Sequence, residues 1–348
     1  MRYKLLGKSG LRVSELSLGT MTFGEEWGWG ASHEESRSMF AEYVDCGGNF
    51  IDTANRYTEG TSEKFVGEFV GTARDSFVIA TKYTLSMDPH DLNAAGNHRK
   101  NMQRSVEASL RRLRTNYIDV LWLHAWDFLT PVEEVMRGLD DLVRSGKILY
   151  IGISDTPAWV VAQANTLAEL RGWTSFIGLQ IEYSLIQRTA ERELLPMARA
   201  FGMTVTPWAV VGGGLLTGKY TGQTQQHAGA DHKRELSADR LNLHNLEIAA
   251  EVRRVAGETG HSAAQVAINW VRQQPGSIIP IIGARTAGQL KQNLDCLEWE
   301  LDSGQLHRLT EASAIDLGFP HEFLAEDRIK NLVYGRRWSL LDHPRLTG

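Results

Sequence analysis

Short apolar runs alternate with longer amphipathic stretches along most of the chain. The runs are apolar nearly throughout rather than at every second position, which is typical of parallel strands buried on both faces. The sequence predicts eight such strands, at residues 15–18, 49–52, 77–81, 117–123, 148–153, 176–180, 203–207 and 277–282.

The stretches between the strands carry helical periodicity and helix-start signals. Residues 101–113 and 262–274 place apolar side chains on one helical face. Ser32 and Glu35 fit a capping box at the start of the first helix. Thr130-Pro131 and Thr156-Pro157 each combine a capping residue with a first-turn proline. The chain is therefore expected to alternate strand and helix throughout.

Eight strands, each followed by a helix and with no break in composition, indicate one (β/α)8 TIM barrel domain spanning residues 1–348. The alternative is an open, doubly wound sheet that binds a dinucleotide through a GxGxxG turn. Three groups of glycines fail to complete that spacing: Gly7 and Gly10, Gly28 and Gly30, and Gly212-Gly213-Gly214. The missing motif favours the barrel.

Three segments exceed a minimal barrel. The first eleven residues contain a glycine-flanked turn and are typical of a hairpin that precedes the first strand. Residues 212–244 form a long polar loop after strand 7, and such a loop in a compact domain is more often a functional flap than a linker. The segment from residue 303 onward is expected to fold over the active-site face as a C-terminal tail.

Composition and charge exclude several other classes of protein. The chain is 42% hydrophobic and 23% charged, unlike a disordered protein. Its 42 acidic and 37 basic residues give a net charge of −5, so nucleic acid and anionic membranes are not expected partners. No run of 18 apolar residues and no signal-peptide core occurs, so no membrane span is expected.

Two cysteines, Cys46 and Cys296, lie outside any metal-ligand spacing. They fit buried small residues in a reduced, cytoplasmic protein. The expected partner is a small molecule, and self-association as a homo-oligomer stays open.

In a (β/α)8 barrel the active site lies at the C-terminal ends of the strands. Asp52, Lys82 and His124 end the second, third and fourth strands, and Tyr57 follows Asp52 in the loop. Polar or aromatic residues also end the next three strands: Ser154 and Asp155, Gln180, and Trp208. We therefore expect these side chains to meet on one rim.

The first four residues suggest a specific chemistry. A tyrosine hydroxyl is normally a weak acid, but the Lys82 ammonium would lower the pKa of Tyr57, and Asp52 would hold Lys82 by a salt bridge. His124 would hydrogen-bond and orient a substrate oxygen. Each residue alone also fits a structural role. Together they suit protonation of a carbonyl oxygen while hydride adds to its carbon.

A metal site built from Asp52, His98 and His124 is the competing interpretation, as in barrel hydrolases. However, no HxH pair ends the first strand, and Lys82 would place a positive charge beside any cation. The sequence therefore predicts no metal.

Several longer motifs run in order along the chain: LGKSGLRVS at 6–14, LGTMTFG at 18–24, GNFIDTA followed by Tyr57, ATK at 80–82, LH at 123–124, IGIS at 151–154, LLTGKY at 215–220 and IGART at 282–286. Together they resemble the aldo-keto reductase superfamily over essentially the whole chain, with most likeness to its bacterial and potassium-channel β-subunit-like branch. The resemblance implies a barrel that binds NADP(H) in extended form without a Rossmann domain, with NAD(H) as the alternative.

The resemblance also implies roles for individual residues. Tyr57 would be the general acid, tuned by Lys82 and Asp52, and His124 would orient the carbonyl. Trp208 would stack on the nicotinamide ring, and Arg285 would contact a 2′-phosphate. The implied cofactor contacts are Thr20, Met21, Ser154, Gln180, Trp208, Ala209, Val211, Gly213, Lys219, Gly283, Arg285, Gln289 and Asn293.

Some of these residues have a second interpretation. Thr286 and Gln289 fit a capping box of the last barrel helix, so Gln289 would then serve helix geometry alone. Trp208 also fits core packing, and Lys219 fits an exposed flap. Arg285 precedes a helix N-terminus, which is a natural phosphate site.

Two positions depart from the family pattern. Trp208 is followed by Ala209-Val210 where the branch usually has Ser-Pro, which removes one hydroxyl. Asp155 stands where the family often has asparagine, and a carboxylate cannot donate as an amide does. We expect both departures to affect cofactor affinity rather than catalysis.

The sequence therefore predicts NADPH-dependent reduction of aldehydes or ketones to alcohols. Trp27 and Trp126 would line an aromatic substrate pocket, although packing of surface loops explains both tryptophans equally well. The alternative function is a nucleotide-binding, redox-sensing regulatory subunit without significant turnover. An intact set of four catalytic residues argues against that alternative.

Overall fold

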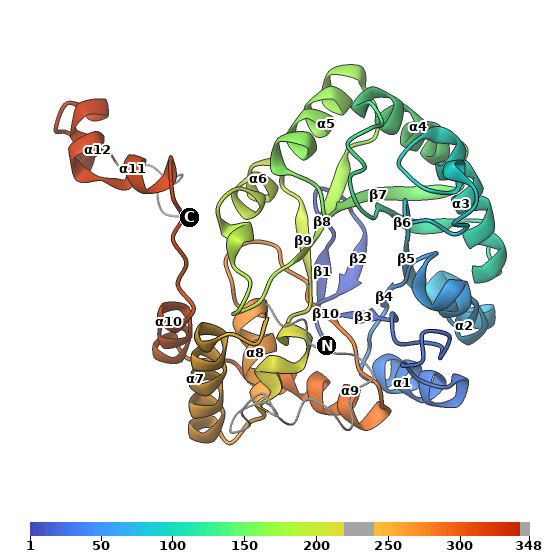
Figure 1. Ribbon diagram of the computed structural model, residues 1–348, viewed down its shortest axis with the longest axis horizontal. Coiled ribbons are helices and arrows are strands. Elements are labelled where there is room, and N and C mark those ends of the chain that lie inside the picture. Colours follow the sequence, from blue (N-terminus) through green and yellow to red (C-terminus); the bar gives the residue numbers. More distant parts are fainter. Residues whose placement is uncertain (219–239, 342–348) are drawn as a thin grey trace.

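A ring of parallel strands surrounded by helices forms the body of the protein (Figure 1). The computed structural model describes residues 1–218 and 240–341. Neighbouring strands of the ring follow the order β10-β3-β4-β5-β6-β7-β8-β9. Their bounds are β3 (Ser17–Gly19), β4 (Phe50–Asp52), β5 (Val78–Tyr83), β6 (Ile118–Leu123), β7 (Ile148–Ser154), β8 (Phe176–Glu182), β9 (Thr204–Trp208) and β10 (Ile281–Ile282). Each predicted strand overlaps one of these.

The ring closes between β9 and the segment before β10. Val205 of β9 forms a parallel bridge with Ile278, and its amide donates to Ser277 O at 2.8 Å. The last predicted strand is regular only at Ile281–Ile282, because Pro280 has no N–H to give to a strand ladder. The predicted TIM barrel is therefore confirmed, and the open sheet is wrong.

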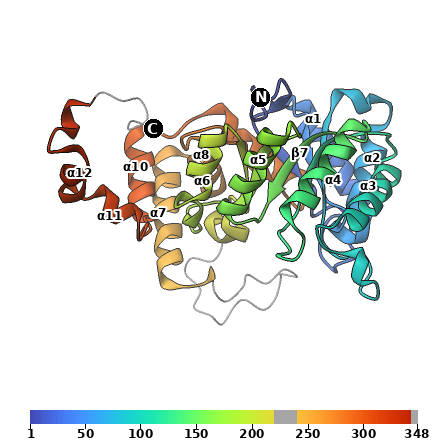
Figure 2. The ribbon, with the colours of Figure 1, turned by 90° about the horizontal axis from the view of Figure 1, so that it is seen from above.

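Helices cover the outside of the ring (Figures 1 and 2). Their bounds are α1 (His33–Asp45), α2 (Thr61–Val70), α3 (Arg99–Leu113), α4 (Val132–Arg144), α5 (Ala158–Arg171), α6 (Leu194–Phe201), α7 (Leu243–Thr259), α8 (Ala263–Arg272) and α9 (Ala287–Leu294). Within the described part of the chain, no helix has both the length and the apolar character needed to cross a membrane.

The predicted capping box of α1 forms only in part, whereas α8 has a complete box that was not predicted from the sequence. Ser32 caps α1 by accepting from the Glu35 amide. The Glu35 carboxylate accepts from the Ala287 amide at 2.6 Å instead of returning to Ser32, so this box is only half formed. At α8, Ser262 and Gln265 form a complete capping box.

Thr130 and Thr156 are not helix caps, contrary to the prediction. Pro131 and Pro157 are themselves the N-cap residues of α4 and α5, with ψ of 139° and 140°. Each threonine therefore lies one residue outside its helix, at a position where a following proline disfavours helical backbone. Its hydroxyl donates within the loop that precedes the helix.

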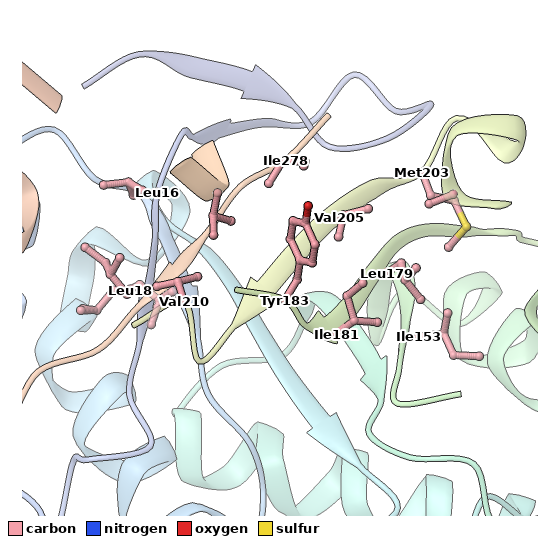
Figure 3. Close-up of a cluster of buried hydrophobic side chains, with 14 of the residues drawn as sticks. Leu16, Leu18, Ile153, Leu179, Ile181, Tyr183, Met203, Val205, Val210 and Ile278 are labelled. Carbon is pink, nitrogen blue, oxygen red and sulfur yellow. The ribbon is translucent and has the colours of Figure 1, made fainter. Parts of the chain in front are cut away.

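Most buried apolar side chains lie between the strands and the surrounding helices. Figure 3 shows part of this layer, including Leu179 and Ile181 of β8 and Val205 of β9. Because side chains alternate along a strand, the outward positions of Leu179 and Ile181 leave Gln180 directed into the barrel. The core thus decides which strand residues face the site.

A second, smaller apolar cluster fills the inside of the barrel. Its buried members are Leu6, Val13, Phe50, Val78, Ala80, Val120, Trp122 and Ile279. The Trp122 ring of β6 occupies space left by glycines on the next two strands, β7 and β8. A Cβ on Gly152 would overlap the ring, and a Cβ on Gly178 would lie 2.7 Å from its Cη2. The interior at this level is therefore packed and is not a pore.

The predicted N-terminal hairpin closes one end of the barrel. It consists of β1 (Tyr3–Leu5) and β2 (Arg12–Ser14), paired antiparallel. Leu6 and Val13 are fully buried in the interior cluster. Gly7, with φ of 57°, lies so close to the backbone of β8 that a Cβ would overlap it. Chemistry is therefore restricted to the opposite end, where the strands terminate.

As far as residue 341, where the described part ends, the C-terminal segment does not cover the active-site face, contrary to the prediction. Its helices are α10 (Ser303–Ala312), α11 (His321–Ala325) and α12 (Asp327–Tyr334). Both views show α11 and α12 extending outward beside the barrel (Figures 1 and 2). Arg188 donates to Thr310 O and Arg192 to Asp316 O, each at 2.6 Å, and both bonds tie the segment to the chain before α6. Phe319 is left 83% exposed.

Two smaller expectations have different outcomes. Cys296 is buried as predicted, whereas Cys46 is exposed at the end of α1. The loop after β9 begins with a 3₁₀ helix, η5 (Gly212–Thr217). The body of the predicted flap, residues 219–239, lies outside the described residues.

Replacement of Gly152 by alanine tests the packing inside the barrel. Because the new Cβ overlaps the Trp122 ring, we expect Gly152→Ala to lower the free energy of unfolding by about 1–3 kcal/mol. Gly257→Ala is the matched control: no atom lies within 4 Å of its Cβ in α7, so higher helix propensity leaves stability unchanged or raises it by up to ~1 kcal/mol. Urea unfolding measures both, and equal stability of the two variants would contradict the packing argument.

Candidate active site

Three polar side chains meet at the C-terminal ends of β4 and β5. Lys82 Nζ lies 2.5 Å from Asp52 Oδ2 and donates to Tyr57 Oη at 2.9 Å. It also donates to Thr53 O at 2.9 Å. These bonds use all three protons of the ammonium group. The Lys82 side chain is fully buried and that of Asp52 nearly so, which makes this a desolvated ion pair.

Gln180 links this group to the other side of the barrel. Its Nε2 donates to Asp52 Oδ1 at 2.8 Å, so the two carboxylate oxygens of Asp52 receive Gln180 and Lys82. The resemblance implied only a cofactor contact for Gln180. The structure adds a contact that orients the carboxylate.

His124 lies just beyond β6, and its ring stands nearly perpendicular to that of Tyr57. The ring centroids are 6.1 Å apart, with an interplanar angle of 82°. Burial, with the Lys82 ammonium as the second cause, lowers the pKa of His124 to about 3. The imidazole is therefore neutral at physiological pH. The structure thus brings the four predicted residues together at one end of the barrel.

The charge balance at Tyr57 differs from the sequence prediction. Burial raises the pKa of Tyr57 above its ordinary value, and Lys82 only partly offsets this effect. Burial also opposes the charge on Lys82, but Asp52 and then Tyr57 outweigh it, and the pKa of Lys82 stays above its usual value. The expected direction of the Lys82 effect was right, but the expected net lowering of the Tyr57 pKa was wrong.

The ends of β7 to β9 carry the residues expected to meet the nicotinamide. Ser154 and Gln180 are register partners on neighbouring strands, and Trp208 ends β9. The Trp208 indole N–H donates to Asp155 Oδ1 at 3.3 Å. The carboxylate that replaces the family's asparagine therefore accepts a hydrogen bond from the expected stacking residue. Burial raises the pKa of this carboxyl.

The hydrogen-bonding groups of Thr20, an expected cofactor contact, bond other groups of the protein. Its amide and its hydroxyl donate to Asp52 O at 2.9 and 3.0 Å, and its side chain is fully buried. Thr20 thus fixes the end of β4, and the half-buried Met21 follows it.

The loop after β9 takes a backbone path that favours glycine. Gly213 has φ of 67° within η5, and Ala209, just before it, has φ of 55°. Val211 is half-buried between them. Lys219 lies outside the described residues.

The segment between β10 and α9 holds the remaining predicted contacts. Gly283 is exposed, and Arg285 lies just before the N-cap residue of α9. Gln289 Oε1 accepts from the Arg285 amide at 3.0 Å, and the Gln289 amide donates to the Thr286 hydroxyl at 3.2 Å. Gln289 therefore stabilises the helix start, but the predicted capping box is only half formed, because its side chain bonds the Arg285 amide and not that of Thr286. Asn293 lies in the last turn of α9.

The two tryptophans expected in the substrate pocket have different surroundings. The Trp27 indole N–H donates to Glu59 Oε1 at 3.0 Å, two residues after Tyr57, and its ring packs 5.4 Å from that of Trp29. Trp126 is half-buried and packs against the core. Trp27 is thus tied to the tyrosine turn, while the contacts of Trp126 also fit ordinary packing.

The residues of the alternative metal site serve other purposes. His98 caps α3 by accepting from the Asn101 amide at 3.3 Å, and Asp52 is held by Lys82. Among residues 1–218 and 240–341, no three His, Cys, Asp or Glu side chains gather closely enough to ligate a metal ion.

The arrangement of Asp52, Tyr57, Lys82 and His124 agrees with a comparison of the sequence with known protein families. The sequence profile described as "Aldo/keto reductase family" matches residues 15–314. The chain belongs to the aldo/keto reductase family. Residues 1–14, which precede the match, contain the hairpin that closes the barrel.

Similar curated proteins are reductases and dehydrogenases. This aldo/keto reductase is 40% identical over 328 residues to a norsolorinic acid reductase of Emericella nidulans, covering 91% of the chain and 83% of that protein. It is 36% identical over 339 residues to a putative aryl-alcohol dehydrogenase of Saccharomyces cerevisiae, covering 94% and 90%. It is 36% identical over 342 residues to an aryl-alcohol dehydrogenase [NADP(+)] of Phanerodontia chrysosporium, covering 93% and 89%. The chain is therefore an oxidoreductase.

The site fits the nicotinamide cofactors that aldo/keto reductases use. In the described part of the chain, buried side-chain polar atoms without a partner occur in Asn55, Trp122, His124, Ser154, Ser184, Thr206 and Trp299. Ser154, Thr206 and His124 among them lie on or just beyond β7, β9 and β6. Interior polar groups are rarely left unpaired, so these atoms suit a polar ligand. The Ser154 and Thr206 hydroxyls, on strands that end near the Trp208 indole, suit the carboxamide of a flat nicotinamide ring.

Sequence reasoning missed two of these residues. Asn55 lies inside the motif that ends at Tyr57, so its place in the chain was a signal. Thr206 is two residues before Trp208 on β9, and strand alternation therefore places both on the same side. Neither residue type alone indicates a site.

The protonation of His124 is open to direct measurement. The unfolded imidazole takes up a proton near pH 6.5, whereas the folded one does so only near pH 3. Stability contributed by the neutral imidazole is therefore lost as pH falls from about 6.5 toward 3. We expect the His124 ring signals in NMR spectra, assigned with His124→Gln, to stay constant between pH 5 and 8. A midpoint near pH 6.5 would contradict burial as the controlling effect.

Proposed function

We propose that this aldo/keto reductase reduces aldehydes or ketones to alcohols with NADPH, and that Tyr57 supplies the proton. The observation that carries the proposal is the fully buried Lys82 ammonium, which bonds both Asp52 and the Tyr57 hydroxyl. Such an arrangement has a chemical use wherever negative charge develops on the phenol oxygen.

Bound NADPH supplies a hydride to the carbonyl carbon. The alkoxide that results on the substrate is a strong base, and Tyr57 Oη gives it a proton. The phenolate left behind lies 2.9 Å from Lys82 Nζ, so the ammonium stabilises the charge where it forms. Asp52 keeps Lys82 in place and charged.

His124 acts as an uncharged partner of the carbonyl oxygen. Its lowered pKa keeps the imidazole neutral, so it orients the oxygen by a hydrogen bond and leaves proton donation to Tyr57. Its approach to Tyr57, 6.1 Å between ring centroids, is close enough for both residues to serve one oxygen.

Ser154, Gln180 and Trp208 would hold the nicotinamide, and Arg285 with the N-terminus of α9 would hold the adenosine phosphate. The unpaired Ser154 hydroxyl supports the first assignment. A guanidinium that precedes a helix start supports the second. The Phanerodontia chrysosporium relative is named as an NADP(+) enzyme, which also favours NADP(H) over NAD(H).

Aromatic carbonyl compounds are the proposed substrates. Two relatives are named for aryl alcohols, and Trp27 offers an indole face beside the tyrosine turn. An aromatic ring gains contact area against such a wall.

A reduced, cytoplasmic setting is part of the same proposal, because the two cysteines are free thiols.

The alternative is a nucleotide-binding regulatory subunit without significant turnover. The buried ion pair counts against it, because placing Lys82 and Asp52 out of water is costly and nucleotide binding alone does not need a charged group at Tyr57. Tight NADPH binding with no turnover of any aldehyde would favour this alternative.

Tyr57→Phe tests the proton donor. We expect kcat for NADPH-dependent reduction of benzaldehydes to fall about 10²–10⁴-fold, the usual contribution of a positioned acid, with unchanged NADPH affinity. Tyr3→Phe is the matched control, since the Tyr3 phenol bonds Gly47 O at the closed end of the barrel. Loss of reduced-cofactor absorbance measures both. Equal kcat for Tyr57→Phe and wild type would show that another group gives the proton.

Arg285→Ala tests the cofactor preference. We expect KM for NADPH to rise about tenfold, which corresponds to ~1.4 kcal/mol of lost interaction with the phosphate, while KM for NADH changes little. Lys291→Ala, which removes an exposed charge from α9, controls for general electrostatics. A matching rise for both cofactors would mean that Arg285 does not read the 2′-phosphate.

A further inference from the structure

The turn immediately after Tyr57 has an unusual backbone. Thr58 (φ 46°, ψ 47°) and Glu59 (φ 56°, ψ 29°) are both left-handed, and Gly60 follows with φ of 92°. A left-handed conformation is a genuine outlier for a β-branched residue such as threonine. Such strain persists only where the surroundings over-determine it. Something must therefore hold Thr58 in place.

The Thr58 side chain supplies that restraint. It is fully buried. Its hydroxyl donates to Phe23 O at 2.6 Å, in the loop between β3 and α1, and accepts from the Ser62 amide at 3.1 Å, in the first turn of α2. One hydroxyl thus bridges the two segments that flank the tyrosine turn.

Further hydroxyl groups continue from this point to the catalytic pair. The Ser62 hydroxyl lies 2.8 Å from that of Thr20 and 2.9 Å from that of Thr53. The backbone oxygen of Thr53 accepts from Lys82, and Thr20 bonds Asp52 O. The turn, the strand ends and the ion pair are therefore connected by short, buried hydrogen bonds.

The loop from β3 packs tightly on the same turn. A Cβ on Gly24 would lie 2.8 Å from Thr58 Oγ1, so the loop backbone rests directly on this side chain. On the outer side, Glu59 accepts from the Trp27 indole and pairs with Arg56. The turn is held from both sides, and Tyr57 has little room to shift.

We propose that Thr58 is a positioning residue for Tyr57. The Thr58 hydroxyl fixes the left-handed turn that keeps the Tyr57 phenol oxygen within hydrogen-bond distance of Lys82. The inference rests on the proposed role of Tyr57 and deepens it. A glycine at this position adopts the same angles without strain but many others equally well. The hydroxyl, not a backbone preference, is therefore what selects the productive position.

Thr58→Gly and Thr58→Ser separate the hydroxyl from the backbone. Thr58→Gly removes the hydroxyl and also relieves the strain, so it should fold. We expect its kcat to fall about 10²-fold, the effect of a reacting group displaced by 1 Å, with KM for NADPH within about threefold of wild type. Thr58→Ser keeps the hydroxyl and should restore kcat to within about threefold of wild type. Thr259→Gly, which removes a hydroxyl bonded to Val255 O in α7, should lower stability without lowering kcat.

A crystal structure of Thr58→Gly gives a second readout that needs no turnover. We expect the distance between Tyr57 Oη and Lys82 Nζ to increase beyond hydrogen-bond range from its present 2.9 Å. Wild-type kcat in Thr58→Gly, or an unchanged distance in its crystal structure, overturns the proposal. A wild-type protein without carbonyl turnover would instead contradict the proposed function, while the crystal structure would still decide the role of Thr58.

Discussion

The buried ion pair between Lys82 and Asp52 is the interaction on which the rest of the site depends. A charged ammonium in the interior is tolerated only when it is paired and fully hydrogen-bonded. Asp52, Tyr57 and the Thr53 carbonyl together meet that requirement, and Gln180 satisfies the second carboxylate oxygen. Because Lys82 and these partners come from three strands and a loop, the charge can exist only when the barrel is closed around it.

The architecture confines this charge to one end of the barrel. Trp122 fills the interior over Gly152, and the N-terminal hairpin inserts Leu6 and Val13 at the other end. Water and substrate therefore have one approach, through the loops after the strands. The same packing holds the ends of β4, β5 and β6 in register. The side chains at these strand ends therefore keep their relative positions without contacts between the loops that follow the strands.

The sequence predicted the parts of the molecule that depend on periodicity and on strand ends. Eight apolar runs located the barrel, and the end-of-strand rule brought Asp52, Lys82 and His124 to one rim. The sequence prediction failed where the structure depends on a balance between burial and charge, or on a contact between distant parts of the chain. The caps at Thr130 and Thr156 shifted by one residue because proline takes the cap position. The C-terminal segment is attached to the barrel by contacts such as that between Arg188 and Thr310, 122 residues apart in sequence, which no local pattern encodes.

The pKa of Tyr57 shows that the identities of the site residues do not by themselves give their protonation states. The sequence supplies the Lys82 charge, but only the fold supplies the burial that outweighs it and raises the pKa of the phenol. A phenol with a raised pKa stays protonated, which is the state a proton donor must have before hydride transfer. In the proposed reaction, the Lys82 ammonium acts after hydride transfer, when the phenolate forms in a desolvated site where a neighbouring charge acts strongly. Burial thus acts on the protonated phenol, and the Lys82 charge acts on the phenolate. Both effects depend on the left-handed backbone segment that holds Tyr57 against Lys82.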